Sequence, residues 1–295
     1  HLIAETANLT LDMTLFWEKW LQDIRDSQYD NGHIPLIVPD SGWGSAHAPE
    51  WNAAYVLIAW HLYEHTGDLS VIEAHYPAMR AYVDCELSRL KDGIADSVLG
   101  DWLAPGMLGN APEGPQITAT AYVYRVTSLL ADMAHRTGRP EERDRYREAA
   151  AAIRANFHEK LYRPEAGGYR TDRQTEYRQT SDLLPLAFGL VPDDAVRERV
   201  ANGLLRDVRD TRGDHLNTGI IGTKYILPVL TELGYGETAY RVAAQTTFPS
   251  WGFWIGRGAS TLYEEWREEG RSRNHYMFGT VVDWLYRYRA GILPA

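Results

Sequence analysis

The sequence predicts an all-α protein, an (α/α)6 barrel in which antiparallel helix hairpins form a closed double ring. Three observations lead to this prediction. Apolar residues recur along most of the 295-residue chain at the three- and four-residue spacing of amphipathic helices. Short turns that contain glycine alternate with longer loops. Strand-like alternation is scarce, and the apolar run at 34–39 contains two prolines.

The first clear stripe of apolar residues predicts a helix over 13–27, with Asp12 as its N-cap. Similar stripes predict further helices near residues 51–65, 69–91, 117–137, 140–161, 179–190, 194–209, 219–233, 236–247 and 277–290. Residues 2–10 and the region around 260–267 are candidates for two more. Twelve helices would close six hairpins into a barrel.

The turns between these helices fall into two groups. Short junctions with glycine after a helix lie at 66–68, 137–140 and 234–236. Longer loops are expected at 28–50, 92–116, 163–178, 210–218 and 248–260. Because short turns and long loops alternate, the long loops should gather on one functional rim. No linker or composition shift divides the chain, so residues 1–295 are interpreted as one domain.

Composition narrows the function. The net charge of −10 disfavours nucleic acid and anionic membranes as partners and suits a neutral ligand. No apolar run reaches the ~18 residues of a membrane span. The single cysteine, Cys85, forms no internal disulfide and is interpreted as a core residue, which is compatible with the cytoplasm. The chain starts at His1 rather than Met, so the lack of a targeting signal carries little information.

The residues between Pro249 and Trp266 place carboxylates among aromatic side chains, as a sugar-cleaving pocket requires. Hydrolysis with inversion needs two carboxyl groups on opposite sides of the sugar. Glu264 is the candidate base, and the alternative is a solvated charge on a helix face. Trp102 lies on a long loop that would suit stacking on a sugar. No metal-ligand spacing, phosphate loop or serine-nucleophile motif occurs, so we expect no metal and no cofactor.

Three segments resemble the catalytic domain of bacterial α-L-rhamnosidases, glycoside hydrolase family 78, and the likeness extends from His1 to about Ile292. They are Pro-Ser-Trp-Gly at 249–252 with Gly-Ala-Ser-Thr and Tyr-Glu at 258–264, Asn-His-Tyr-Met-Phe-Gly at 274–279, and Gly-Asp-Trp-Leu-Ala-Pro at 100–105. The resemblance implies the (α/α)6 barrel and an inverting hydrolase that releases L-rhamnose from small-molecule or oligosaccharide rhamnosides without a cofactor.

The same resemblance implies roles for individual residues. The base would be Glu264 rather than Glu265, and His275 would hydrogen-bond the hydroxyls of rhamnose. Three tryptophans would line the sugar pocket: Trp51, Trp102 and Trp251. The alternative for His275 is a buried histidine that caps a helix start.

The chain also departs from the family pattern. The family has Trp-Gly-Asp-Ala where this chain has Trp51-Asn52-Ala53-Ala54, and the spacing from Glu264 to His275 is short. The general acid of the family belongs to a segment that would end just before His1. We therefore expect the chain to lack that segment and any accessory β-domains. Two alternatives stay open: a non-catalytic rhamnose-binding barrel or inactive fragment, and an (α/α)6 glycosidase or lyase for another sugar.

Overall fold

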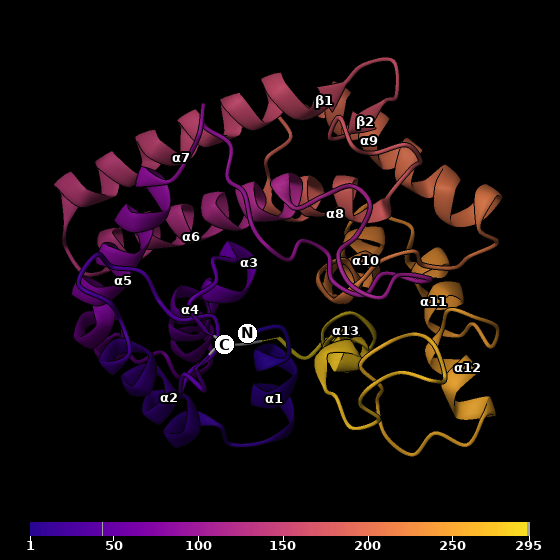
Figure 1. Cartoon of the computed structure of the whole chain (residues 1–295), viewed down its shortest axis with the longest axis horizontal. Helices are drawn as coiled ribbons and strands as arrows, with labels where there is room; N and C mark the ends of the chain where they lie inside the picture. Colours follow the sequence, from indigo (N-terminus) through magenta and orange to yellow (C-terminus); the bar gives the residue numbers. More distant parts are fainter. Residues whose placement is uncertain (43, 294–295) are drawn as a thin grey trace.

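The computed structural model describes residues 1–42 and 44–293, and in it the helices follow one another around a double ring (Figure 1). Consecutive members of the inner ring contact each other, and the last contacts the first. The inner helices are α1 (Ala4–Thr10), α4 (Ala54–Thr66), α6 (Gln116–Arg136), α8 (Gln179–Phe188), α10 (Ile220–Glu232) and α13 (Val281–Trp284). The closed ring of contacts confirms the predicted barrel.

The outer helices pack against the inner ring. They are α2 (Thr14–Asp26), α5 (Ser70–Ser88), α7 (Pro140–Leu161), α9 (Asp194–Arg206) and α11 (Gly236–Ala243). Within the described residues, α2 and α5 contact α4, while α7, α9 and α11 contact α6, α8 and α10 in that order. Each inner helix from α4 to α10 thus pairs with the outer helix that follows it, which is the hairpin arrangement that the short turns predict.

Shorter elements fill the connections. Helix α3 (Pro49–Asn52) precedes α4, and α12 (Trp251–Gly256) lies at the outer edge of the ring. Strands β1 (Tyr162–Arg163) and β2 (Gly168–Tyr169) form a small antiparallel pair. The predicted helix at 277–290 consists of a 3-10 turn, η2 (Met277–Thr280), then α13, then a π-helical turn, η3 (Leu285–Arg289). A second π-helical turn, η1 (Asp207–Thr211), extends α9.

Most predicted helices agree with the observed ones within a few residues, and 140–161 agrees at both ends. The candidate helix at 260–267 is wrong, because these residues form an irregular loop with several bends, and Leu262 and Glu264 are hydrogen-bonded to the 272–275 segment. The predicted loop 248–260 instead contains α12, whose N-terminus is capped by the Ser250 hydroxyl accepting from Phe253 N–H at 3.0 Å. Asp12 does not cap α2, whose N-cap is Met13.

Buried apolar side chains fill the space between the two rings. The predicted junction at 66–68 turns at Gly67, whose φ of 71° is in the left-handed region that favours glycine. Its N–H donates to the carbonyl of Tyr63 at 2.8 Å and ends α4. None of the described helices has the length and apolar character needed to cross a bilayer.

Candidate functional site

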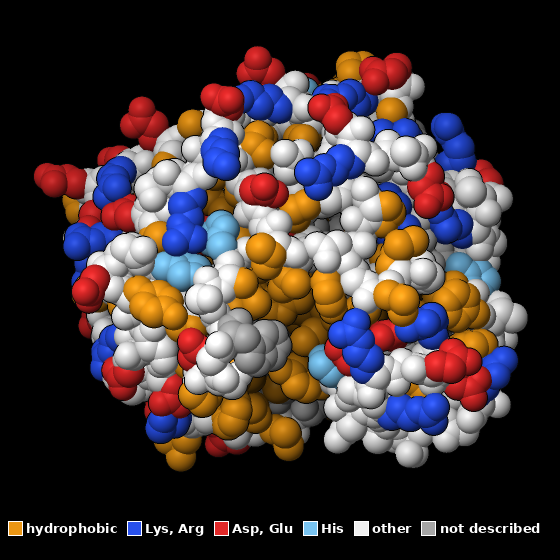
Figure 2. Space-filling view, in the orientation of Figure 1, with side chains coloured by type: hydrophobic (Ala, Val, Ile, Leu, Met, Phe, Trp, Pro, Cys, Tyr) orange, Lys and Arg blue, Asp and Glu red, His pale blue; other side chains and the backbone are white. Residues whose placement is uncertain are grey.

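The candidate residues lie at one end of the inner ring. Trp51 is in α3, directly before α4, and Trp102 is in the loop before α6. Glu264 and His275 are in the loop before α13. Because successive inner helices run in the same direction, the loops that precede them meet at the same end of the barrel. The face drawn in Figure 2 is hollowed near its centre, and hydrophobic side chains gather in the hollow.

Glu264 and His275 belong to two segments that run side by side. The N–H of Glu264 donates to the carbonyl of Ser272 at 2.9 Å, and the N–H of His275 donates to the carbonyl of Leu262 at 2.9 Å. Both side chains are half-buried. These two backbone bonds bring the proposed base and the proposed sugar-binding histidine into neighbouring positions.

Glu265 has different surroundings from Glu264. Its side chain is 2% exposed, accepts from Nε of Arg267 at 3.0 Å and lies 3.7 Å from Nε of Arg271. Arg271 also donates from Nη2 to the carbonyl of Leu108 at 3.0 Å, in the loop that carries Trp102. The Glu265 carboxylate is therefore paired with two guanidinium groups, and through Arg271 it connects the Glu264 loop to the Trp102 loop. The Glu264 carboxylate has no ion-pair or side-chain hydrogen-bond partner among the described residues.

Asp101 holds Trp102 in place through the N-terminus of α10. Its two carboxylate oxygens accept from the backbone N–H groups of Gly219, Ile221 and Gly222 at 2.8–3.0 Å. The hydroxyl of Thr180 donates to the same carboxylate. A carboxylate at a helix N-terminus pairs with the otherwise unsatisfied N–H groups and with the positive end of the helix dipole.

The carbonyl of Trp102 accepts from Ile220 N–H at 2.8 Å, so the backbone on both sides of the Trp102 side chain is fixed on α10. Its ring lies next to Gly109, where an added Cβ would stand 3.4 Å from the indole. The sequence analysis identified Trp102 in the Gly-Asp-Trp-Leu motif but did not predict the role of Asp101. The position of Asp101 directly before Trp102 in this motif could have indicated it.

Trp51 is positioned by the residues on each side of it. The Glu50 carboxylate is fully buried and accepts from Gly100 N–H at 2.8 Å and from the Thr118 hydroxyl at 3.1 Å. The Asn52 amide donates to the carbonyl of Ile34 at 2.9 Å. Trp51 is thereby attached to the loop that carries Trp102 and to the segment that begins at Ile34. The sequence analysis did not identify Glu50. Its position as a charged residue in a mostly apolar stretch, directly before Trp51, could have indicated it.

Ala53, the position at which the chain departs from the family pattern, is fully buried between α3 and α4. The departure from the family pattern therefore lies at a buried position directly after the helix that carries Trp51.

Glu50→Gln is expected to flatten the dependence of stability on pH. Burial raises the pKa of Glu50 from 4.5 to about 7, against the opposing effect of its hydrogen bonds. An acid whose pKa rises on folding keeps its proton longer in the folded state, so its contribution to stability falls as the pH rises through this range. The shift of the pKa from 4.5 to about 7 corresponds to a loss of about 3 kcal/mol at most in the free energy of unfolding. Urea unfolding should show that the free energy of unfolding of the variant, relative to that of the wild type, increases by up to about 3 kcal/mol between about pH 4 and pH 8.

The exposed Glu18 supplies the control for this measurement, because Glu18→Gln should leave the stability difference nearly constant with pH. Other titrating groups are common to the wild type and the variant and cancel in the difference. A constant difference for Glu50→Gln across the same range would contradict the assignment.

Trp251 is less accessible than the other two candidate tryptophans. Its side chain is 7% exposed, and its indole N–H donates to the carbonyl of Phe278 at 2.9 Å. Its ring meets that of Trp266 edge to face at 5.4 Å between centroids. Trp266 in turn stacks on Trp254 at 4.7 Å. The structure therefore places Trp251 in an aromatic cluster behind the Glu264 loop, with little surface free for stacking on a ligand.

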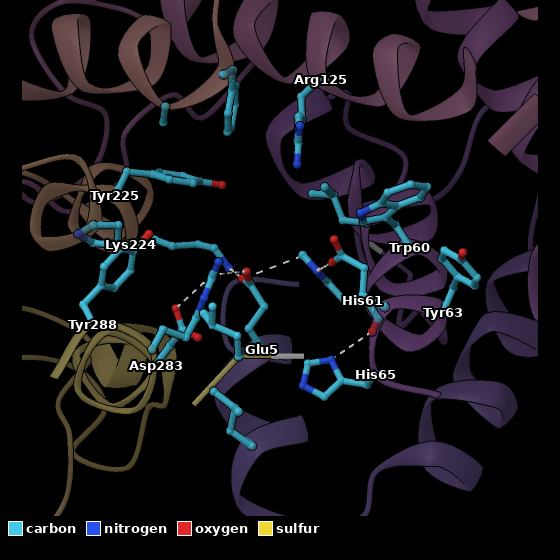
Figure 3. Close-up of a pocket in the computed structure, with 18 of the residues that line it drawn as sticks. Glu5, Trp60, His61, Tyr63, His65, Arg125, Lys224, Tyr225, Asp283 and Tyr288 are labelled. Atoms are coloured by element: carbon cyan, nitrogen blue, oxygen red, sulfur yellow. Dashed lines mark hydrogen bonds and ion pairs between the residues drawn. The ribbon is translucent and has the colours of Figure 1, made fainter. Parts of the chain in front are cut away.

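A second cavity, of about 660 Å³, lies toward the other end of the barrel. Its lining comes mainly from the middle and later parts of the inner helices. Figure 3 shows Glu5, His61, Lys224 and Asp283 pointing toward one another within it. The Glu5 carboxylate forms ion pairs with Lys224 and with Arg287, the latter at 3.3 Å.

The charges in this cavity shift one another's titration. Burial opposes ionisation of Glu5, but His61, Lys224 and Arg287 together hold its pKa below the usual range. Burial and the negative charge of Glu5 raise the pKa of Asp283 to about 6. The acidic side chains of the cluster are balanced by its basic ones, and its residues connect α1, α4, α10 and α13. It contains none of the residues predicted for the sugar site.

Comparison with known proteins adds to this geometry. The family model described as the bacterial alpha-L-rhamnosidase 6 hairpin glycosidase domain matches residues 1–288. A curated alpha-L-rhamnosidase from Formosa agariphila is 31% identical over 308 residues, covering 100% of this chain and 32% of that protein. One from Streptomyces avermitilis is 34% identical and covers 100% of this chain and 28% of that protein.

Two solved structures are similar throughout the barrel. The alpha-L-rhamnosidase from Dictyoglumus thermophilum has a TM-score of 0.93 and 36% identity, covering 97% of this chain and 32% of that one. The Streptomyces avermitilis alpha-L-rhamnosidase complexed with L-rhamnose has a TM-score of 0.88 and 32% identity, covering 100% and 28%. The chain spans less than a third of the length of these two curated relatives. The match over residues 1–288 shows that the chain belongs to the family of bacterial alpha-L-rhamnosidase six-hairpin glycosidase domains.

Proposed function

We propose that this domain binds L-rhamnose at the rim of the barrel and hydrolyses α-L-rhamnosides with inversion, with Glu264 as the general base. Membership of the family supports the hydrolase class. The names of the relatives support rhamnosides as substrates, and the Streptomyces avermitilis protein has been seen with L-rhamnose. The net charge of −10 suits a neutral sugar better than an anionic one.

The observation that carries the proposal is the contrast between two adjacent carboxylates. A general base has to accept a proton from water, so its oxygens must be accessible and not already committed to strong donors. Glu265 is buried and paired with Arg267 and Arg271. Glu264 is half-buried, faces no cation among the described residues and lies beside the His275 segment.

The remaining candidate residues then take complementary roles. Trp51 and Trp102 present apolar ring faces to the C–H groups of the pyranose, and His275 hydrogen-bonds its hydroxyls. Trp251 supports the wall behind the Glu264 loop. Inversion leaves room for a water molecule between the base and the anomeric carbon, so the acid and base carboxyls would lie about 6.5–9.5 Å apart.

The general acid is a separate matter. Two buried carboxyls have raised pKa values: burial raises the pKa of Glu50, in α3, and of Glu113, in the loop before α6, to about 7. A raised pKa suits a general acid. Both side chains are nevertheless covered by protein, with exposures of 0% and 1%. They do not reach a sugar at the rim, so we assign the acid to neither of them.

The test follows the anomer that forms first. Proton NMR of an aryl α-L-rhamnoside mixed with the 295-residue chain should show β-L-rhamnose before mutarotation begins. An activated aryl leaving group needs little protonation, so its hydrolysis reports on the base even where the acid contributes weakly. First appearance of α-L-rhamnose would mean retention and would overturn the role given to Glu264.

Calorimetric titration with rhamnose separates the remaining alternatives. Binding of rhamnose without release of the aryl group would indicate a non-catalytic rhamnose-binding barrel. Hydrolysis of a different aryl glycoside in a panel, with no binding of rhamnose, would indicate another sugar as substrate.

A further inference from the structure

Trp266 follows the proposed base by two positions and lies in the interior of the protein. Its side chain is 1% exposed, so it is not available to a sugar at the rim. Its indole N–H donates to the carbonyl of Thr218 at 3.1 Å. Thr218 directly precedes Gly219, the N-cap of α10, so this bond connects the Glu264 loop to the start of that helix.

The ring and the backbone of Trp266 are held as well. The ring stacks on that of Trp254 at 4.7 Å between centroids with an angle of 18°, and it meets the ring of Phe278 at 4.4 Å. The carbonyl of Trp266 accepts from the indole N–H of Trp254 at 2.9 Å. Contacts on the side chain and on the main chain therefore fix the chain two residues after Glu264.

The bond from Trp266 to Thr218 differs from the other bonds around the base. Backbone hydrogen bonds join Glu264 and its neighbour Leu262 to the 272–275 segment. Both partners lie in the loop before α13, so these bonds set the shape of the loop. The partner of Trp266 is 48 positions away, at the start of an inner helix. This bond therefore sets the position of the loop relative to the inner ring.

The start of α10 also holds the loop that carries Trp102. The Asp101 carboxylate accepts from three backbone N–H groups there, directly after the carbonyl that Trp266 contacts. One short stretch of backbone thus holds the loop of the proposed base and the loop of a proposed sugar contact. A general base must lie within hydrogen-bond reach of the water that it activates beside the sugar, and a common anchor keeps that distance constant.

We propose that Trp266 is a positioning residue for Glu264, because its indole N–H and its stacked ring hold the carboxylate at a fixed distance from the sugar on Trp102. Trp266 does not touch the sugar and acts through Glu264. This inference rests on the proposed function, since positioning affects the rate only where Glu264 is the base. A displacement of a catalytic group by about 1 Å can lower a rate by about 100-fold.

Trp266→Phe tests the proposal because it keeps an aromatic ring in the stack but removes the N–H donor. With an aryl α-L-rhamnoside as substrate, kcat should fall by about 10–100-fold. The dissociation constant of L-rhamnose, measured by titration calorimetry, should stay within about threefold, because Trp266 makes no contact with the sugar. Trp254→Phe, which removes the donor to the carbonyl of Trp266, should also lower kcat, by a smaller factor.

The double variant Glu264→Gln/Trp266→Phe distinguishes positioning from a structural role. If Trp266 acts through Glu264, no base is left to misplace in this background. The double variant should therefore hydrolyse the aryl rhamnoside within about twofold of the rate of Glu264→Gln alone. A further drop of about 10-fold or more would mean that Trp266 supports the whole site and would overturn the proposal.

Trp284→Phe is the matched control. Trp284 is also 1% exposed, and its indole N–H donates to the Thr231 hydroxyl at 2.9 Å, near the opposite end of α10. Trp284→Phe and Trp266→Phe should lower the urea midpoint of unfolding by similar amounts, but Trp284→Phe should keep kcat within about twofold. Equal losses of kcat in the two variants would contradict the positioning role.

The outcomes separate this inference from the proposed function. If Glu264→Gln hydrolyses at the wild-type rate, Glu264 is not the base, and the proposed function fails together with the inference. If Glu264→Gln is slow but Trp266→Phe keeps the wild-type kcat, the positioning role alone is overturned. Should Trp266→Phe not fold, Trp254→Phe alone and combined with Glu264→Gln carries the same comparison.

Discussion

Glu264→Gln is expected to lower the rate of hydrolysis of an aryl α-L-rhamnoside by about 10²–10⁴-fold, the contribution of a positioned general base. The amide keeps the shape of the side chain but cannot accept a proton from water. Rhamnose affinity should change by less than about threefold, because the roles in sugar binding belong to Trp51, Trp102 and His275. Initial rates of phenol release and calorimetric titration with rhamnose measure the two quantities.

Rescue by azide tests whether Glu264 acts as the base that activates water. Azide is a nucleophile that needs no deprotonation, so it should partly restore turnover in Glu264→Gln and give the β-rhamnosyl azide. It should not accelerate the wild-type protein. Glu269→Gln, in the same acidic run but exposed, is the matched control and should keep the full rate. A wild-type rate in Glu264→Gln would remove Glu264 from the mechanism.

Glu265→Gln distinguishes the two adjacent carboxylates in a different way. Its buried side chain neutralises Arg267 and Arg271 and leads through Arg271 to the Trp102 loop. Its replacement should therefore lower the free energy of unfolding and weaken rhamnose binding, without rescue by azide. Rescue of Glu265→Gln by azide would exchange the roles given to Glu264 and Glu265.

The double ring could be predicted from the sequence because each helix carries its own periodic apolar stripe. A stripe such as that of 140–161 records which face packs inward, and the flanking residues mark both ends. The loop at 260–267 could not be predicted in the same way. Its residues are compatible with a helix locally, but the backbone hydrogen bonds to Ser272 and His275 and the packing of Trp266 on Trp254 hold it in an irregular loop.

The candidate site was predictable where one residue's own chemistry marked it. Trp102 in its motif and Glu264 among aromatic residues stand out in the sequence. The groups that position them do not, because their partners are distant in the chain. Asp101 reaches the N-terminus of α10, 118–121 positions away, and Glu50 reaches Thr118. The charged cavity around Glu5 could not be predicted for the same reason, since all six inner helices contribute to its lining.

Asp101→Asn is expected to lower the free energy of unfolding by about 3–5 kcal/mol. Its carboxylate is fully buried and accepts three backbone N–H groups of α10 and the hydroxyl of Thr180. Hydrogen bonds to a charged group contribute about 1.5–3 kcal/mol each, and the amide would turn donors toward donors. Urea unfolding followed by tryptophan fluorescence gives the change.

Controls keep this prediction falsifiable even where Asp101→Asn folds poorly. Thr180→Val removes a single hydrogen bond to the same carboxylate and should lower the free energy of unfolding by about 1.5–3 kcal/mol. Asp96→Asn, at an exposed position in the same loop, should change stability by no more than about 0.5 kcal/mol. A wild-type unfolding midpoint for both Asp101→Asn and Thr180→Val would mean that the carboxylate does not hold the start of α10.

The same variant links stability to the candidate site. Trp102 lies between the Asp101 contacts and its own bond to Ile220, so loss of the carboxylate frees the backbone that orients the indole. Rhamnose affinity in Asp101→Asn, measured well below the unfolding transition, should therefore fall by about 10-fold, the upper range of a lost stacking contact. Thr180→Val should leave it nearly unchanged. If rhamnose binds Asp101→Asn as tightly as the wild type, the ring of Trp102 is not a sugar contact.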